Sequence, residues 1–241
     1  MDKHRDELLG RYTKEYFAYL GYDHGKNLQA VVEEGLSIAY PLMVKEMGGK
    51  TVVCLAEEIE EAIPEIEKMP AGSLFDDFAN FLFEPETPFE KDFSYIGVHD
   101  LRTVGEVELP AGISVRRLDR EDKQDKKLFA QFYRTIAKKE QALAQVSLTD
   151  DYVLGLFLRG ELVSAASSLM WNDIMDIGVA TRPDKRGKGF GVLAVRKLCR
   201  LRAGENIAQY RCDKTNAASV RLMESAGFIP AAKLTGMILK I

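Results

Sequence analysis

The segment RPDKRGKGFG, residues 182–191, combines three glycines with four cationic side chains directly after the apolar run 174–181. A strand that enters a glycine-rich turn and then a helix gathers unpaired backbone N–H groups and the positive end of the helix dipole at one place. Glycine permits a positive φ and a close approach of a ligand to the backbone, while Arg186 and Lys188 add positive charge. This combination predicts a phosphate site, with a pyrophosphate as the natural ligand.

Two nucleotide-binding patterns compete for this segment. A Walker P-loop is excluded, because Gly189 follows Lys188 where that pattern needs a Ser or Thr hydroxyl. A Rossmann fingerprint is harder to dismiss, since residues 189–194 read G-x-G-x-x-A and Asp213 follows 22 residues after Gly191. However, only 28 residues remain after Asp213, which is too few for the further β-α units of a doubly wound domain. The Rossmann interpretation is therefore disfavoured.

A third pattern, that of the GNAT superfamily of acyl-CoA N-acyltransferases, resembles this sequence at two motifs. The pyrophosphate loop of the superfamily, Arg/Gln-x-x-Gly-x-Gly/Ala, is similar to residues 186–191, and Pro183 stands where the family commonly has a proline. The second family motif, Asn-x-x-Ala/Ser-x-x-Leu followed after four residues by Gly-Phe, is matched by Asn216, Ser219, Leu222, Gly227 and Phe228. The resemblance covers residues 112–241, and the run 209–219 is similar to a bacterial subgroup with an N-terminal extension.

The resemblance implies a fold and a co-substrate. The fold would be of the α+β or α/β class, with a mixed central sheet in the order β-α-β-β-β-α-β-α-β, and the co-substrate would be acetyl-CoA. In the family the fourth strand splays from the fifth, and its free main-chain amides bind the pantetheine arm. By position the residues implied in CoA binding are Val179, Ala180, Thr181, Arg186, Gly187, Lys188, Gly189, Phe190, Gly191, Asn216 and Ser219.

The resemblance also directs the search for catalytic groups. An alkyl amine is mostly protonated at neutral pH, so amide synthesis needs a base. The family often uses an acidic residue as this base and places it on the strand that here contains Asp173 and Asp176. These two have opposite parity, so at most one should face the cleft. The Tyr that usually protonates the departing thiolate is replaced by Met223, which leaves Tyr210 and Cys212 as substitutes.

These residues need a scaffold, which the apolar patterns outline. In the second half we expect strands at 113–118, 152–159, 161–171, 173–181, 205–213 and 233–241, and helices at 119–139, 190–203 and 216–226, the last with Asn216 as its N-cap. In the first half we expect helices at 2–20, 28–43, 59–66 and 74–82, a strand at 51–56 and a loop at 83–93. Gly21 should end the first helix, and Ser73 should cap the last.

The charge distribution separates two predicted domains near residues 108–113. Residues 1–110 carry 10 Lys/Arg and 23 Asp/Glu, a net charge of −13, whereas residues 111–241 carry 23 and 14, a net of +9. We therefore expect an acidic, mainly helical domain at 1–110 and the acyl-CoA-binding domain at 111–241. The acidic half argues against nucleic-acid binding. Its acidic run at 56–68 is most simply a solvated helix face, although it could attract a cationic acceptor.

Composition excludes several other classes. Three cysteines without C-x-x-C spacing and three histidines argue against disulfides and against a metal site. The polar N-terminus lacks the pattern of a secretory signal, and no apolar run approaches the length of a membrane span. We therefore expect a cytoplasmic protein with no membrane partner. His24 and His99 are weak candidates for an acceptor cleft.

The sequence thus predicts an acetyl-CoA-dependent N-acetyltransferase that acts on a small-molecule or peptide amine, with a homodimer as one arrangement. Two other hypotheses stay open. The domain could have lost catalysis and respond to CoA as a binding module, as the replacement of the usual Tyr by Met223 suggests. Residues 1–110 could also be a separate protein-interaction domain with its acidic face toward a basic partner.

Overall fold

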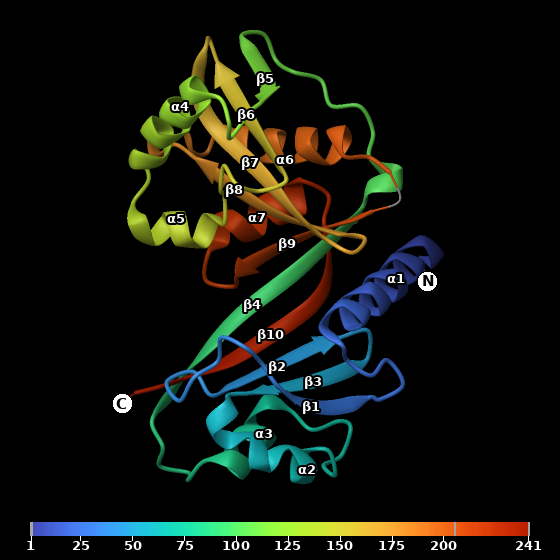
Figure 1. Cartoon of the computed structure of the whole chain (residues 1–241). Helices are drawn as coiled ribbons and strands as arrows, with labels where there is room; N and C mark the ends of the chain where they lie inside the picture. The colour runs from blue at the N-terminus through green and yellow to red at the C-terminus, as the bar shows by residue number, and fades with distance from the viewer. Residues whose placement is uncertain (1, 205, 241) are drawn as a thin grey trace. The chain divides into compact units, whose positions relative to one another are not determined.

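The computed structural model describes residues 2–204 and 206–240, which form a mixed α and β fold (Figure 1). These residues make two compact units. One comprises residues 2–97, 211–220 and 230–240, and the other comprises Val98–Tyr210 and Arg221–Ile229. The predicted fold class is confirmed, whereas the domain boundary near residue 110 stays a prediction. No helix within the described residues is both long and apolar enough to cross a membrane.

The first unit is built on strands in the order β1-β3-β2-β10-β4. Their bounds are β1 Leu28–Val32, β2 Leu42–Met47, β3 Lys50–Leu55, β4 Phe89–Asp100 and β10 Ile229–Leu239. β1 runs parallel to β3, whereas β2 pairs antiparallel with both β3 and β10. Strand β4 contributes Val98–Asp100 to the other unit and β10 contributes Ile229, whereas residues 211–213 of β9 (Ile207–Asp213) belong to the first unit.

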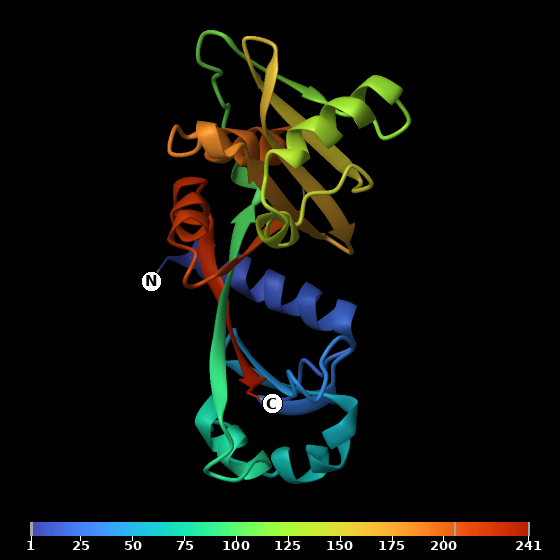
Figure 2. The ribbon, with the colours of Figure 1, turned by 90° about the vertical axis from the view of Figure 1, so that its left-hand side faces the viewer.

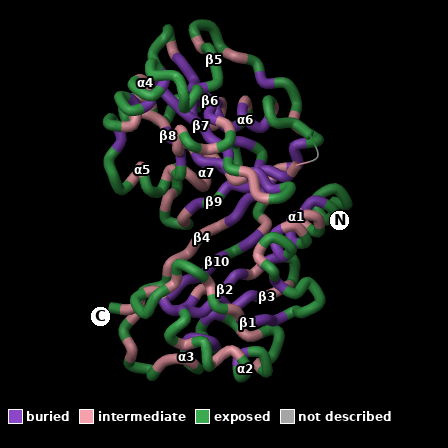
Figure 3. Tube along the Cα trace, viewed as in Figure 1, coloured by how far each residue is buried: buried purple, intermediate pink, exposed green. Residues whose placement is uncertain are grey.

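Helices cover both faces of this sheet (Figure 2). α1 (Lys3–Leu20) lies on one face, and the 3₁₀ helix η1 (Glu57–Ala62), α2 (Ile63–Ile66) and α3 (Phe75–Leu82) lie on the other. Alternating residues of β2 and β3, such as Leu42 and Val53, join Phe78 of α3 in one buried cluster. Figure 3 shows the same concentration of buried residues along these strands.

The structure corrects several expectations for the first half. The segment 28–43 is not a helix: it forms β1 and the first residues of β2, because the short apolar run LQAVV pairs with β3 and Gly35 turns the chain with φ +94°. Such short runs fit both periods, and pairing decides between them. The loop 83–93 ends at Pro88, where β4 follows. The first half is therefore mixed rather than mainly helical.

The predicted ends and capping residues of the helices in this unit are only partly confirmed. Helix 2–20 is confirmed as α1, with Asp2 as its N-cap and Gly21 in the left-handed region at its C-terminus. The segment 59–66 divides into η1 and α2. Helix α3 has Leu74 rather than Ser73 as its N-cap, because the Asp77 carboxylate accepts the Leu74 N–H at 2.7 Å.

The second unit carries the strand order β9-β8-β7-β6-β5. The strands are β5 Ile113–Arg117, β6 Tyr152–Leu158, β7 Glu161–Trp171, β8 Ile174–Thr181 and β9 Ile207–Asp213. β5 to β8 pair antiparallel, whereas β8 and β9 are parallel. α4 (Lys123–Arg134) and α5 (Lys138–Ala144) cover one face, and α6 (Phe190–Leu201) packs against β7 and β8 on the other.

The predicted element order of the second half is confirmed, with three corrections. The predicted single helix 119–139 is two helices, because α4 ends with Thr135 as its C-cap and α5 begins only at Lys138. β10 begins at Ile229, four residues before the expected strand. β9 begins at Ile207, and residue 205 of the expected strand lies outside the described residues, as does residue 241. Asn216 caps α7 (Ala217–Ser225) as predicted, since its Oδ1 accepts the Ser219 N–H at 3.1 Å.

A buried ion pair holds the α1 side of the first unit's sheet. The Lys45 ammonium, on a side chain that is 3% exposed, donates to Glu33 Oε1 at 2.7 Å and to the Tyr22 hydroxyl at 3.0 Å. The Tyr22 hydroxyl in turn donates to Glu33 Oε2 at 2.7 Å. Burial alone would raise the pKa of the Glu33 carboxyl, but Lys45 and Tyr22 outweigh it and hold that pKa below its usual range.

We predict that Lys45→Met lowers the free energy of unfolding by about 3 kcal/mol at neutral pH. This is the lower end of the range for breaking a buried pair, because 24% of the Glu33 side chain stays exposed to water. A carboxyl with a lowered folded-state pKa stabilises the protein above its ordinary pKa and loses that contribution as the pH falls. The difference from wild type should therefore shrink when Glu33 is protonated. Urea denaturation at several pH values measures it.

Lys233→Met is the matched control. Lys233 and Glu46 also form an ion pair on this unit, at 3.0 Å, but both side chains are exposed. Removing the lysine there should cost at most about 1 kcal/mol. Equal losses for the two variants would contradict a special role of the buried pair.

Candidate functional site

The turn between β8 and α6 has the conformation that the sequence predicts. After the 3₁₀ helix η3 (Pro183–Lys185), Gly187 and Gly189 have φ of +73° and +78°, which other residues adopt at a cost. Within the described residues no heavy atom lies within 4 Å of the Cβ position of either glycine. The turn is therefore strained for other residues and open on its outer side.

α6 begins with its N-terminal amides free. Gly189 is its N-cap and offers no side chain, and the first bond of the helix runs from the Leu193 N–H to the Gly189 carbonyl. Within the described residues nothing accepts the N–H groups of Phe190, Gly191 and Val192. These donors point along the positive end of the helix dipole, which is an arrangement that binds anionic oxygens.

The two cations of the turn differ in their partners. The Arg186 guanidinium forms a two-pronged ion pair with Glu140 of α5, at 2.6 and 3.1 Å, and its Nε donates to the Thr181 carbonyl at 3.2 Å. Lys188 is exposed and makes no ion pair within the described part of the chain. The sequence did not point to Glu140, because it lies 46 positions before Arg186.

Gly191 fixes the turn against its surroundings. A Cβ at this position would lie 2.9 Å from Leu222 Cδ1 of α7, 3.2 Å from Thr181 Oγ1 and 3.9 Å from Val179 Cγ2. The glycine thus lets the first turn of α6 approach the end of β8 and α7 closely. Residues of both sequence motifs, Gly191 and Leu222, meet at this contact.

The parallel pairing of β8 with β9 is short. It includes Ile174↔Ile207, Met175↔Ala208 and Asp176↔Gln209 and then stops. From Ile177 to Thr181 β8 keeps only its antiparallel partner β7 among the described strands. Val179, Ala180 and Thr181 lie in this stretch, so β8 has main-chain groups without a strand partner next to the turn.

The structure separates the two candidate aspartates. Asp176 occupies the last paired position of β8, is half-buried, and its Oδ1 accepts a 3.0 Å hydrogen bond from Gln209 Nε2. Asp173 is exposed in the turn between β7 and β8, next to Asn172 with φ +50°. Asp176 therefore lies where the two strands part, and Asp173 lies at the other end of β8. Gln209 was not predicted, because a parallel register cannot be read from one strand.

The candidate proton donors to the departing thiolate are buried in the packing of the protein. Tyr210 of β9 is 5% exposed, and its ring centroid lies 5.9 Å from that of Phe228. Met223 of α7, at the position of the family's usual Tyr, is 3% exposed. Cys212, Asn216 and Ser219 belong to the first unit, where Cys212 is buried and Asn216 caps α7.

The weaker candidates are not residues of the turn. His24 belongs to the first unit, with its ring 5.8 Å from that of Phe17. The acidic run has its glutamates on the surface, and Glu67 pairs with Lys26 at 2.9 Å. His99 belongs to the second unit and lines a pocket there. No group of three or more metal-binding side chains occurs within the described residues.

Comparisons with known proteins identify the family of the chain. Residues 101–237 match the family model described as GNAT acetyltransferase, whereas no curated protein matches the chain. A GCN5-related N-acetyltransferase from Sphaerobacter thermophilus is similar over 85% of this chain and 82% of its own, with 12% identity and a TM-score of 0.50. A functionally unknown conserved protein from Staphylococcus epidermidis ATCC 12228 is similar over 70% and 69%, with 13% identity and a TM-score of 0.52. At such identities these structures show a common fold.

We predict that Gly191→Val lowers the free energy of unfolding by about 1–3 kcal/mol, because its side chain would press on Leu222 and Thr181. Gly204→Val is the control, since the atom nearest its Cβ position is Asn206 Oδ1 at 4.0 Å. Chemical denaturation of both variants measures the difference. Equal stabilities would mean that the close approach at Gly191 does not require glycine.

Proposed function

Because the chain belongs to the GNAT acetyltransferase family, we propose that it is an acetyl-CoA-dependent N-acetyltransferase that transfers the acetyl group directly from the thioester to a primary amine. The turn at residues 186–191 carries this proposal. Its glycines have positive φ and open surroundings, and no side chain caps the first turn of α6. A diphosphate fits a concave set of free amides with a cation beside it.

Each part of the donor has a proposed partner. The amides from Gly187 to Gly191 would bind the pyrophosphate, with Lys188 and Arg186 as cationic neighbours and Phe190 inside the first turn of α6. The edge of β8 at Val179, Ala180 and Thr181 would bind the pantetheine amides. Its main-chain N–H groups would donate hydrogen bonds to the pantetheine carbonyls, and its main-chain carbonyls would accept hydrogen bonds from the pantetheine N–H groups. Asn216 and Ser219 stay proposed contacts through the second motif. The short β8–β9 pairing supports the assignment to β8.

Asp176 is the better supported base. It lies at the point where β8 and β9 part, and its Oδ1 accepts the Gln209 bond described above. Only about one alkyl amine in 10³ is deprotonated at neutral pH, so a carboxylate that takes the ammonium proton, directly or through water, increases the reactive fraction. The amine would then attack the thioester carbonyl, and the C–S bond would break. Asp173, exposed in the β7–β8 turn, is the weaker alternative.

The departing thiolate has no Tyr from α7 to protonate it, because Met223 occupies that position. Tyr210 stays the proposed proton donor, and Cys212 the weaker alternative. Release of the thiolate without protonation by the protein is equally compatible with activity. The acceptor is proposed to be a small-molecule or peptide amine, and the protein is proposed to act in the cytoplasm, as a monomer or homodimer.

A second candidate function follows from the same residues. If Met223 removes the acid and Asp176 only orients Gln209, the unit binds CoA without turnover and serves as a CoA-responsive module. Release of CoA thiol with any member of an amine panel would rule this alternative out. Residues 1–110 would then stay a proposed acceptor-shaping or interaction domain.

We predict that wild-type protein binds acetyl-CoA and that Gly189→Glu abolishes the binding. The glutamate would bring a negative charge and a disfavoured φ to the centre of the anion cradle. Gly204→Glu, with the same added charge beyond the other end of α6, should bind like wild type. Calorimetric titration measures all three. If wild-type protein does not bind acetyl-CoA at millimolar concentration, the proposed function is wrong.

We further predict that Asp176→Asn lowers kcat about 10²-fold, which is typical for the loss of a positioned base. The KM for acetyl-CoA should not change, because the donor contacts lie on the turn and the edge of β8. Asp173→Asn should stay within twofold of wild type. Thiol release with the first acceptor found in a panel of polyamines, aminoglycosides and lysine peptides is the assay. A larger loss for Asp173→Asn would reverse the assignment.

A further inference from the structure

A pocket lies within the second unit, away from the turn at residues 186–191. It has a volume of about 330 Å³ and is bounded by η2 (Leu101–Thr103) and the residues after it, by α6 and by the turn after α7. Its polar lining comes from His99, Thr103, Arg196, Cys199 and Ser225. Arg196 follows Gly189 by seven positions, which is roughly 10 Å along the axis of α6. The volume is that of a small-molecule site rather than of a large cofactor.

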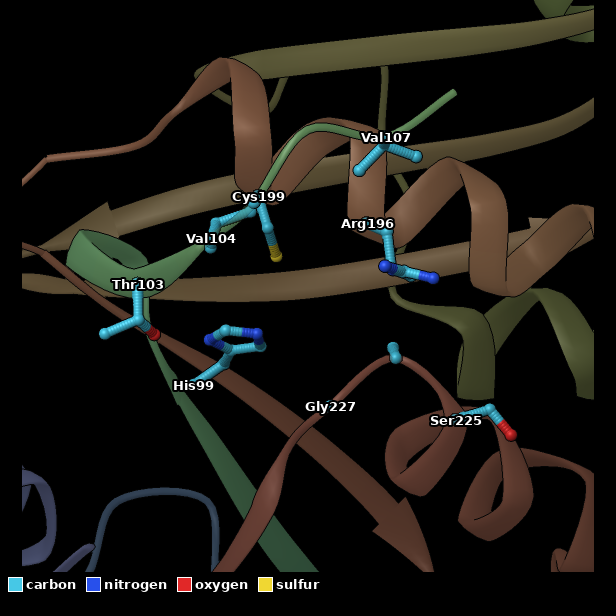
Figure 4. A pocket seen from close by; sticks show the side chains of 10 residues that line it. His99, Thr103, Val104, Val107, Arg196, Cys199, Ser225 and Gly227 are labelled. Carbon is cyan, nitrogen blue, oxygen red and sulfur yellow. The ribbon is translucent and has the colours of Figure 1, made fainter. Parts of the chain in front are cut away.

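Two nitrogen-bearing side chains face the space of this pocket. Figure 4 shows the Arg196 guanidinium, from α6, and the His99 ring on either side of it, above the turn that contains Gly227. His99 Nδ1 lies 3.1 Å from the Asp100 carbonyl, and since a carbonyl only accepts, Nδ1 carries a proton. His99 Nε2 is then the nitrogen that gains or loses a proton. It lies 3.2 Å from the Cβ position of Gly227, in the pocket wall.

Two acids beside the lining residues bind arginines other than Arg196. The Asp100 carboxylate binds Arg102, with Oδ2 2.5 Å from Nη2, and the Glu106 carboxylate binds Arg200. Arg196 forms no hydrogen bond or ion pair with any residue that the structure describes. A guanidinium without a carboxylate, beside a polar pocket, is a site for an external anion.

The groups around His99 determine how its protonation would respond to an anion. Burial lowers the pKa of His99, the carbonyl and carboxylate of Asp100 oppose this, and the positive charge of Arg196 lowers it further. Burial raises the pKa of the Cys199 thiol to about 12, so this lining group is neutral. The lining residues from the turn after α7 have no titratable side chain. An anion between Arg196 and His99 would therefore favour the imidazolium and take up a proton.

We propose that this pocket binds a small oxyanion, a carboxylate or a phosphate, between the Arg196 guanidinium and the His99 imidazolium. The planar guanidinium donates two parallel N–H bonds to two oxygens of one group. His99 Nε2 donates the third bond when protonated, and the rest of a small ligand occupies the pocket toward Thr103 and Val107. The site is distinct from the pyrophosphate turn and does not depend on the acetyltransferase proposal.

The test is histidine NMR on the full chain, which contains only three histidines, His4, His24 and His99. His99→Gln identifies the His99 signal. Titration with malonate and, separately, inorganic phosphate should shift this signal saturably, whereas chloride at equal ionic strength should not. The anion with the lower Kd identifies the carboxylate or the phosphate class. Equal shifts of all three histidines, or no saturable shift at 50 mM of either anion, would overturn the proposal.

Two variants separate this site from general surface charge. Arg196→Gln should raise the Kd about tenfold or more, because it removes a charge-assisted pair of bonds. Lys197→Gln removes the same charge from the next position of α6 and should change the Kd less than twofold. Equal effects of the two substitutions would reduce the site to net charge and contradict the proposal.

Two further experiments test whether the anion binds next to His99 and apart from the turn at residues 186–191. Sulfate keeps its charge between pH 8 and 6, so its affinity should rise as the pH falls in wild type and not in His99→Gln. A flat profile in wild type would exclude His99 as a donor. Saturating acetyl-CoA should leave the His99 shift in place. Displacement of the anion by acetyl-CoA would assign it to the donor turn and would overturn a separate pocket.

Discussion

The second unit depends on one steric constraint, the absence of a Cβ where α6 begins. Gly191 lies so close to Leu222 and Thr181 that a Cβ at this position would require the end of the Leu222 side chain to shift. This contact brings the free amides of α6 next to the end of β8. It also joins the two sequence motifs, because one supplies the glycine and the other supplies the leucine that packs on it. Local sequence at the turn and packing at α7 are therefore parts of one arrangement.

A second close approach fixes β8 from its other face. A Cβ at Gly178 would lie 2.0 Å from the Gln145 carbonyl oxygen, so the end of α5 rests directly on the strand. Positions 176 and 178 share this face, whereas 179 and 181 face α6. Asp176 therefore points to the side of α5, and the residues near Gly191 point to the other.

The sequence predicted what depends on local chemistry. The turn at 186–191, the caps Asn216 and Gly21, and the strands of the hairpin around Gly160 all follow from residue types at fixed spacing. What it missed depends on pairing between distant segments. LQAVV became a strand because β3 lies beside it, and Glu140 and Gln209 became neighbours of Arg186 and Asp176 only through the packing of α5 and the register of β9.

The Lys45–Glu33 pair of the first unit and the Arg186–Glu140 pair of the second differ in the free energy needed to separate their charges. Lys45 is buried beside Glu33, so its separation from the carboxylate would leave a buried ammonium without its counter-charge. Arg186 and Glu140 are both exposed, at 44% and 43%, and a pair of this kind is worth about 0–1 kcal/mol. A phosphate that offers Arg186 a charge-assisted bond can displace Glu140 at little cost. Because Glu140 holds the side chain and leaves the amides of α6 open, the turn keeps its strongest donors available while its arginine is already ordered.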